Sequence, residues 1–338
     1  MTKLYFLPIE GQGTEHIEAL SSYLTRLAEV HTVSVGVLLK YLRASGGRNL
    51  AMLVQGHEAF ATCIRPKPLI AELLTLLEAA LDLDHGALEA STFLALEKCF
   101  GRSEANYAIN IRWCTACFRE QVKSGRPVYF KVVWQLNQVH RCHVHGVRLR
   151  QSCPNCGHFP FGYLNTYLPR NRCGCCHWIL DETVPADIVP AQAMDTEIYA
   201  LIQYIASNPG VRFPGGGVSK VVTTLLEEAK NTGTEKALYR ILPRQDCLDF
   251  AKARTNVSML STLQIAYRLR LPLVAVLQGD VTGTTRSLLE MNEEELPHSL
   301  ASVQRCYWST KEGRVGRLAH SFWLKRPELD EPLPSLEY

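Results

Sequence analysis

The feature that most constrains this chain is a run of cysteines and histidines in its centre. The chain has 338 residues and twelve cysteines, and eight of the twelve lie between positions 114 and 176. Seven of these eight, together with one histidine, form pairs at the same spacing: Cys114-x2-Cys117, Cys142-x2-His145, Cys153-x2-Cys156 and Cys173-x2-Cys176. A tight turn across two intervening residues can aim both side chains at one metal ion. Metal binding is therefore the leading explanation for these cysteines.

The order of the pairs predicts two four-ligand sites that follow one another along the chain. The first set is Cys114, Cys117, Cys142 and His145, and the second is Cys153, Cys156, Cys173 and Cys176. The 16 residues between Cys156 and Cys173 agree with the spacing of C-x2-C…C-x2-C zinc sites. An arrangement in which alternate pairs share an ion stays open. Cys175 could also replace Cys176, and His177 is a weaker candidate.

Each predicted site is filled by protein ligands, which indicates a structural role for the metal. A catalytic zinc keeps one coordination position open for water or substrate. The sequence contains no HExxH motif, no deaminase-type HxE…PCxxC motif, no GxxxxGK[ST] phosphate loop and no GxSxG elbow. We therefore expect two structural Zn²⁺ ions, no catalytic residues and no enzymatic activity, with a zinc enzyme as the least favoured alternative.

Composition and the first residues place the chain among ordinary soluble proteins. The hydrophobic fraction is 46% and the charged fraction 20%. The opening MTKLYFLPIEGQG lacks the apolar run of a signal peptide, and no stretch approaches the roughly 18 apolar residues of a membrane span. We expect a cytoplasmic protein without membrane association, in which cysteines indicate metal rather than disulfides. The scattered cysteines are expected to be small buried hydrophobes: Cys63, Cys99, Cys247 and Cys306.

The charge of the chain is concentrated in its centre. Residues 101–180 hold eleven Lys and Arg against two acids, a charge of +9, while the remaining 25 basic and 31 acidic residues give −6. A Cys₃His zinc site carries −1 and a Cys₄ site −2, so the metal-loaded segment would fall to about +6. A basic centre between acidic flanks favours a nucleic-acid or other polyanionic partner.

Periodicity predicts helices on both sides of this centre. Residues 14–42 read as two helices with a turn at 31–33, in which Thr14 caps the first helix and Ser34 the second. Further helices are expected at 69–83, 87–99, 194–206, 218–230, 234–242, 245–254 and 258–280. Short β-like runs such as 128–136 add an α+β character to the centre. The Pro-containing segment 181–192 is the best boundary.

These patterns predict a mainly α protein with a small zinc-stabilised α+β centre. The expected domains are an N-terminal helix-turn-helix domain over 1–105, a tandem zinc-binding module over 106–184, and a C-terminal helical domain with a repressor-like helix-turn-helix over 185–338. An ordinary helical hairpin and an ordinary helical bundle are the alternatives to the two helix-turn-helix units. The recognition-like helix of the second unit is expected around Arg244–Arg254.

Three features together resemble the TniQ family of bacterial transposon target-selection proteins. One is the opening FLPIEGQGTEHIEALSSYLTRLAEVHTVSVGVLLKYL, in which a proline-containing start precedes an SxLxRLA helix. Another is the ordered series in RWCTACFREQ…VVWQLNQVHRCHVHGVRLRQSCPNCG: a CxxC, a tryptophan strand, CxxHG, then CPxCG. In the family the last knuckle often reads CxCG, which would favour Cys175 over Cys176. The third and less specific feature, SMLSTLQIAYRLRLPLVAVLQGD, is similar to the last helices of repressor-type domains.

The resemblance implies a role in target selection without catalysis. TniQ-like proteins connect a target-recognition component to an AAA+ ATPase regulator, which recruits the transposase, and some members bind a DNA attachment site themselves. Shorter members act as adaptors on a CRISPR RNA-guided effector complex, often as homodimers. The expected partners are therefore an AAA+ regulator, Cascade-type effector subunits with guide RNA or target DNA, and a second copy of the chain.

Two functions remain in competition at this point. One is the adaptor, and the other is a stand-alone sequence-specific zinc-containing DNA-binding protein. The basic side chains that we expect to contact nucleic acid or a partner are Arg148, Arg150, Arg170, Arg172, Arg244, Lys252 and Arg254.

Overall fold

The computed structural model describes residues 4–44, 65, 68–100, 106–161, 170–181, 188–189, 193–252 and 257–281. All the described residues belong to one compact unit, Met1–Met291. Cys63 and Cys306 lie outside the described residues, while Cys99 and Cys247 are buried, as expected of small hydrophobes.

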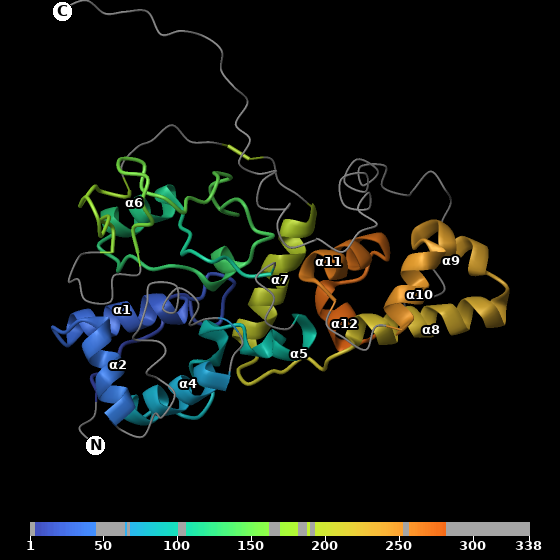
Figure 1. The fold of residues 1–338 in the computed structure, drawn as a ribbon, viewed down its shortest axis with the longest axis horizontal. Coiled ribbons are helices and arrows are strands. Elements are labelled where there is room, and N and C mark those ends of the chain that lie inside the picture. Colours follow the sequence, from blue (N-terminus) through green and yellow to red (C-terminus); the bar gives the residue numbers. More distant parts are fainter. Residues whose placement is uncertain are drawn as a thin grey trace, which may run out of the picture. The chain divides into compact units, whose positions relative to one another are not determined.

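The described part of the chain is mainly helical (Figure 1). In the first half, its α-helices and 3₁₀ turns are α1 (Leu20–Val30), α2 (Val35–Ala44), α4 (Pro68–Leu81), η2 (Glu89–Ser91), η3 (Leu94–Leu96), α5 (Glu97–Phe100), α6 (Thr115–Lys123) and η4 (Val132–Gln135). In the second half they are α7 (Ala193–Ser207), α8 (Gly217–Thr232), α9 (Glu235–Ile241), α10 (Arg244–Lys252), α11 (Met259–Arg268) and α12 (Leu273–Gln278).

The two helices expected in the opening segment are present, but the first begins later than its periodicity suggested. The predicted cap of α2 is present, because the Ser34 hydroxyl accepts a hydrogen bond from the backbone of Val37 at 3.3 Å. Thr14, in contrast, caps no helix, and its hydroxyl donates to the carbonyl of Gly11 at 2.7 Å. The reason is tertiary. The backbone N–H of Ala19 donates to Phe130 at 2.8 Å, which holds the residues before α1 extended.

Helices α1, α2 and α4 share one apolar core. Leu24 and Leu27 of α1, Leu39 of α2 and Ile70 and Leu73 of α4 are all fully buried. These side chains recur at helical spacing, so each helix presents one apolar face to the others. Packing of α2 against both α1 and α4 then fixes the helical hairpin in place.

The predicted helix over 87–99 is divided into 3₁₀ turns followed by one turn of α-helix. The break lies at Thr92, which is extended, with φ −136° and ψ 179°. Its hydroxyl accepts a hydrogen bond from the backbone N–H of Leu94 at 3.2 Å and donates one to the carbonyl of Glu89 at 2.7 Å. Threonine hydroxyls that bond to nearby backbone in this way compete with the helical ladder.

The β-like reading of residues 128–136 was wrong. Among the described residues the centre holds isolated β-bridges but no strand, and residues Val132–Gln135 form the 3₁₀ turn η4. All four residues of this turn are buried, so the run does not alternate between buried and exposed positions as a half-buried strand would. A short apolar run does not distinguish these cases by its pattern. The expected tryptophan strand is part of this turn, since Trp134 lies within it.

The second half follows the predicted order of helices closely. Helices α8 to α12 correspond to the expected segments, Arg244 is the first residue of α10, and Pro272 is the N-cap of α12. Within the same compact unit, α7 packs on η4, and the Gln203 side-chain amide donates to the carbonyl of Gly13 at 2.8 Å. The Asn106 side chain accepts from the backbone of Met259 at 3.0 Å. The helices after residue 193 are thus joined to the N-terminal and central segments.

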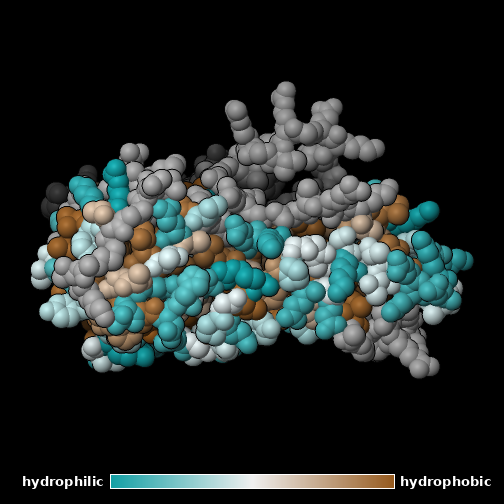
Figure 2. All heavy atoms as spheres, turned by 90° about the horizontal axis from the view of Figure 1, so that it is seen from below, coloured by the Kyte–Doolittle hydropathy of each residue, from teal (hydrophilic) through white to brown (hydrophobic). Residues whose placement is uncertain are grey.

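The surface of the described residues mixes polar and apolar side chains. On the face shown in Figure 2, teal hydrophilic side chains are interspersed with brown apolar ones. None of the helices in the described part of the chain is both long and apolar enough to pass through a membrane.

Candidate metal centres

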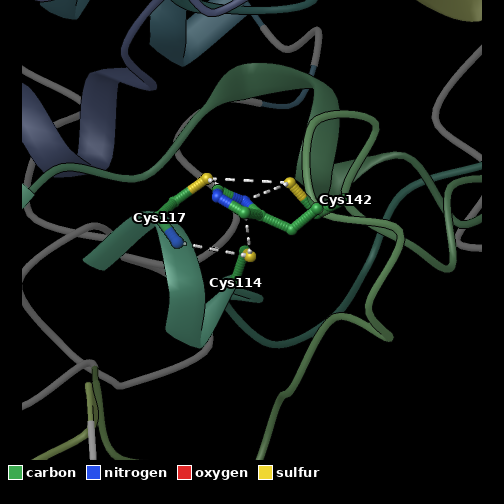
Figure 3. A group of neighbouring side chains, drawn as sticks. Cys114, Cys117 and Cys142 are labelled. Carbon is green, nitrogen blue, oxygen red and sulfur yellow. Dashed lines mark hydrogen bonds between the residues drawn. The ribbon is translucent and has the colours of Figure 1, made fainter. Parts of the chain in front are cut away.

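The first candidate centre joins the beginning of α6 to a tight turn later in the chain. Cys114 is the N-cap of α6 and is extended, and its Sγ accepts a hydrogen bond from the backbone of Cys117 at 3.5 Å. This cap puts both sulfurs on the same side of the first helical turn. Cys142 lies in the loop after η4, and Figure 3 shows the three cysteine side chains converging.

The spacing of the four donor atoms fits a tetrahedral metal ion. The Cys117 and Cys142 sulfurs lie 3.6 Å apart. The Nδ1 atom of His145 lies 3.6, 3.4 and 3.5 Å from the sulfurs of Cys114, Cys117 and Cys142. A tetrahedral zinc would place two sulfurs about 3.8 Å apart and a sulfur and a nitrogen about 3.6 Å apart. The structure therefore brings together the first predicted set in the geometry that a metal requires.

Electrostatics favour a cation at this centre. Hydrogen bonding with Cys114, and then with Cys142, raises the pKa of Cys117, while hydrogen bonding from Cys114 lowers the pKa of Cys142. Three buried thiolates at this separation would repel one another in the absence of a cation. A coordinated divalent ion removes the conflict, since it deprotonates the coordinating thiols outright.

Two residues that the sequence did not predict contact these ligands without belonging to the four-donor set. The Glu120 carboxylate is 2.8 Å from Nε2 of His145, so it orients the ring whose Nδ1 faces the sulfurs. Glu120 stands three residues after Cys117 on α6, a spacing that could have indicated a shared helix face. The Lys131 ammonium donates to the Cys117 sulfur at 3.7 Å and is buried. No local pattern pointed to Lys131, because it reaches the centre through the tertiary fold.

The second predicted set is also assembled. The sulfurs of Cys153 and Cys176 lie 3.6 Å apart, and those of Cys156 and Cys173 lie 3.7 Å apart. All four donors of this set lie within 4.8 Å of one another. These distances again fit a tetrahedral ion with sulfur ligands. The sequential partition of the pairs is therefore the one in the structure, and the interleaved alternative is not.

Three of the four pairs share one backbone turn. In each turn the first cysteine carbonyl accepts a hydrogen bond from the residue after the second ligand: Gly146 at 2.8 Å, Gly157 at 2.9 Å and His177 at 2.9 Å. These three residues have φ values of +67°, +73° and +59°. The left-handed conformation aims both ligands of a pair at the same point and suits glycine. His177 occupies this position in the third turn and is exposed, so it lies outside the four-donor set.

Cys176, rather than Cys175, belongs to the second cluster. Cys176 accepts a hydrogen bond from the Asn155 side chain at 3.5 Å, and this hydrogen bond lowers the pKa of the thiol. Cys175 is exposed, but it lies near Cys156 and His158 and forms a looser group of three donors with them. The CxCG reading that the family pattern favoured therefore does not describe this knuckle.

The predicted contact residues fall into different environments. Arg148, Arg172 and Arg244 are exposed. Arg150 is half-buried and exchanges two backbone hydrogen bonds with Trp113. Arg170 is the exception, because its side chain is largely buried and pairs with Glu29 of α1 at 2.9 Å.

Arg170 therefore ties the segment before the last knuckle to α1 and presents little surface to a partner. Burial lowers the pKa of its guanidinium, which is still held by Glu29. The remaining two contact residues are Lys252 and Arg254. Lys252 ends α10, but its side chain lies outside the described residues, as does the whole of Arg254.

One part of the chain matches a known protein family. The TniQ family model matches residues 11–149, and no curated protein matches the chain. The matched stretch contains α1, α2, α6 and all four donors of the first cluster, and it ends before Cys153. The second cluster therefore lies beyond the match. Residues 11–149 of this chain are thus similar to the TniQ family.

Proposed function

We propose that this protein is a non-catalytic adaptor for target selection in transposition, with two structural zinc ions. It links a target-recognition component, a CRISPR RNA-guided effector complex, to an AAA+ ATPase regulator and through it to the transposase. The observation that carries the proposal is the TniQ match together with an intact first metal cluster inside it. Transposition-associated target selection is the role that this similarity suggests.

The donor sets support structural zinc. Each described cluster supplies four protein donors, three thiols and an imidazole in one case and four thiols in the other. Such sets suit zinc, whose structural sites are tetrahedral and closed. A closed site offers no position for a substrate, so the metal would organise the surrounding loops and take no part in chemistry.

The charge of the metal-binding segment supports contact with a polyanion. Residues 101–180 carry +9, and about +6 once the two zinc sites are counted. Arg148 lies between the two clusters in the chain and is exposed, as is Arg172 in the last knuckle. These arginines can pair with phosphate groups of guide RNA or DNA, or with acidic surfaces of a partner.

Co-purification tests the adaptor directly. Tagged full-length protein would be co-expressed with candidate effector subunits, guide RNA and an AAA+ regulator. We expect both partners in the eluate, and less effector complex with Arg148→Glu. Lys236→Glu, an exposed charge reversal on α9, is the matched control. Recovery of neither partner, or strand transfer stimulated by the chain alone, would contradict the adaptor role.

The alternative is a stand-alone protein that binds an attachment site in duplex DNA. The helices α10 and α11, which resemble the repressor-type arrangement, favour it, with Arg244 exposed at the start of α10. This alternative predicts tight binding of the isolated protein to one duplex, with affinity falling steeply as salt rises. An adaptor would show only weak, sequence-independent binding in the same titration.

A further inference from the structure

A buried lysine beside the first metal centre has no carboxylate partner in the described part of the protein. Lys131 is 5% exposed. Its ammonium donates to the Cys117 sulfur at 3.7 Å and lies 5.2 Å from the centre of the Trp134 ring. Burying an ammonium group without a compensating charge is costly, so its partner must supply negative charge.

The carboxylates of Glu18 and Glu120 are already engaged. Glu18 faces Lys131 across a backbone bridge, but its side chain is held by Arg26 at 2.6 Å and by Ser22 at 2.7 Å. Glu120, on the other side of the cluster, is held by His145 at 2.8 Å. In the zinc-loaded protein the anionic partner of Lys131 would therefore be the Cys117 thiolate, and the Trp134 ring adds a cation–π contact.

The charge of the metal centre explains why a cation is needed there. Three thiolates and a neutral imidazole around a divalent ion leave a net charge of −1. One ammonium group cancels that charge. The second centre, with four thiolates, would carry −2, and its donors Cys156 and Cys176 are only partly buried, so water can solvate it. The first centre has three buried cysteines, and a built-in cation replaces the missing solvent.

We propose that Lys131 is the counter-cation of the first metal centre and that its positive charge slows loss of the metal. Lys131 is a positioning and charge-balancing residue and does not coordinate the ion. Since Lys131 also pairs through its backbone with Glu18, just before α1, the metal centre and the N-terminal helices are joined at this residue. The inference rests on the proposed zinc assignment of the first cluster.

The test is zinc release from the zinc-loaded full chain to excess chelator, with a colorimetric zinc indicator. Lys131→Met removes the charge but keeps most of the apolar stem. We expect the metal of the first centre to leave roughly tenfold to a hundredfold faster, the usual effect of losing a residue that supports metal ligands. The metal of the second centre should leave at the wild-type rate. Cobalt substitution tells the two centres apart, because Cys₃His and Cys₄ sites differ in their sulfur-to-cobalt absorption.

Two further variants separate charge from packing. Lys131→Arg retains the charge and should release zinc at close to the wild-type rate, and Lys123→Met, an exposed lysine of α6, should have no effect. Cys142→His reduces the thiolates to two, so the centre becomes neutral and Lys131 becomes a surplus charge. In that background Lys131→Met should slow release, or restore folding if the single variant fails to fold.

The outcomes distinguish this inference from the zinc assignment beneath it. A wild-type chain that binds no zinc would overturn both. A chain that binds two zinc ions and releases the first at the same rate with Lys131→Met would overturn only the role of Lys131. Equal acceleration by Lys131→Met and Lys131→Arg, or no compensation by Cys142→His, would show that packing and not charge is responsible.

Discussion

Single residues decide how well the ligands of the first metal cluster are held. His145 presents Nδ1 to three sulfurs while Nε2 meets Glu120 at 2.8 Å. This contact fixes the tautomer of the ring, because one nitrogen must carry the proton that points to the carboxylate. The Glu120 side chain is 62% exposed, and its carboxylate both orients the ring and makes the imidazole a stronger metal ligand.

We predict that Glu120→Gln lowers the zinc affinity of the first centre by about tenfold or more. The amide can still accept a hydrogen bond from His145, but it no longer attracts the imidazole by its charge. Competition with a chelator of known affinity measures the change. Glu227→Gln, an exposed change on α8, is the control, and equal affinity in both variants would contradict the role of Glu120.

The three left-handed residues after the knuckles give a second prediction at this scale. Gly157 has φ +73° and no atom near the position of an added Cβ, so only backbone strain would oppose a side chain there. Gly157→Val should therefore destabilise the zinc-loaded protein by about 1–2 kcal/mol. His177→Gly should stay within about 1 kcal/mol of wild type, because relief of strain offsets added chain entropy. Melting curves compare the two, and equal losses would contradict the argument.

At the scale of elements, α1 is attached to the opening segment by a buried ion pair. The Arg26 guanidinium meets the Glu18 carboxylate at 2.6 Å, and both side chains are at most 5% exposed. Arg26 also donates to the carbonyl of Pro8 at 3.1 Å. Burial raises the pKa of Glu18, and Arg26 acts in the opposite direction. The pair therefore holds the segment before α1 against the helix.

We predict that Arg26→Met destabilises the protein by about 3–5 kcal/mol at neutral pH, since it leaves Glu18 buried without a partner. A carboxyl with a raised folded pKa binds its proton more readily when folded, so the deficit should shrink as the pH falls toward 4.5. Urea unfolding at several pH values measures this. Arg43→Met, exposed at the end of α2, is the control. A deficit independent of pH would show that lost packing, and not the charge of Glu18, is responsible.

At the scale of the whole molecule, the metal clusters lie within a unit that also contains the helices on either side. Cys114 and Cys142 contribute to the first cluster, and α7 packs on η4. The backbone of Lys131 forms a β-bridge with the backbone of Glu18, just before α1. Metal binding that orders the central loops should therefore also stabilise the helices on both sides.

Chelation, or Cys114→Ser, is accordingly expected to unfold the central segment and to lower the melting temperature of the adjoining helices. Metal binding free energy is folding free energy where loops have few regular elements of their own. Circular dichroism and calorimetry with and without chelator would show one shifted transition. An unchanged melting curve would contradict structural zinc, and a central transition separate from an unchanged helical one would contradict the coupling.

The sequence alone determined the x2 ligand pairs, most of the helices and the family resemblance, because each depends on local spacing. An x2 pair, a helical period or a serine such as Ser34 before an apolar run depends on neighbours in the chain. The donors of both clusters and helices α8 to α12 fall where these patterns predicted.

Only the tertiary structure decided the rest. It pairs residues 17–19 with residues 130–132 by backbone hydrogen bonds, which delays α1. Its core surrounds Val132–Gln135, which form a 3₁₀ turn and not a strand. It pairs Arg170 with Glu29 and brings Lys131 to the Cys117 sulfur. The physical reason is the same in each case. Burial and charge compensation act between residues far apart in the chain, and no local pattern records which groups will meet.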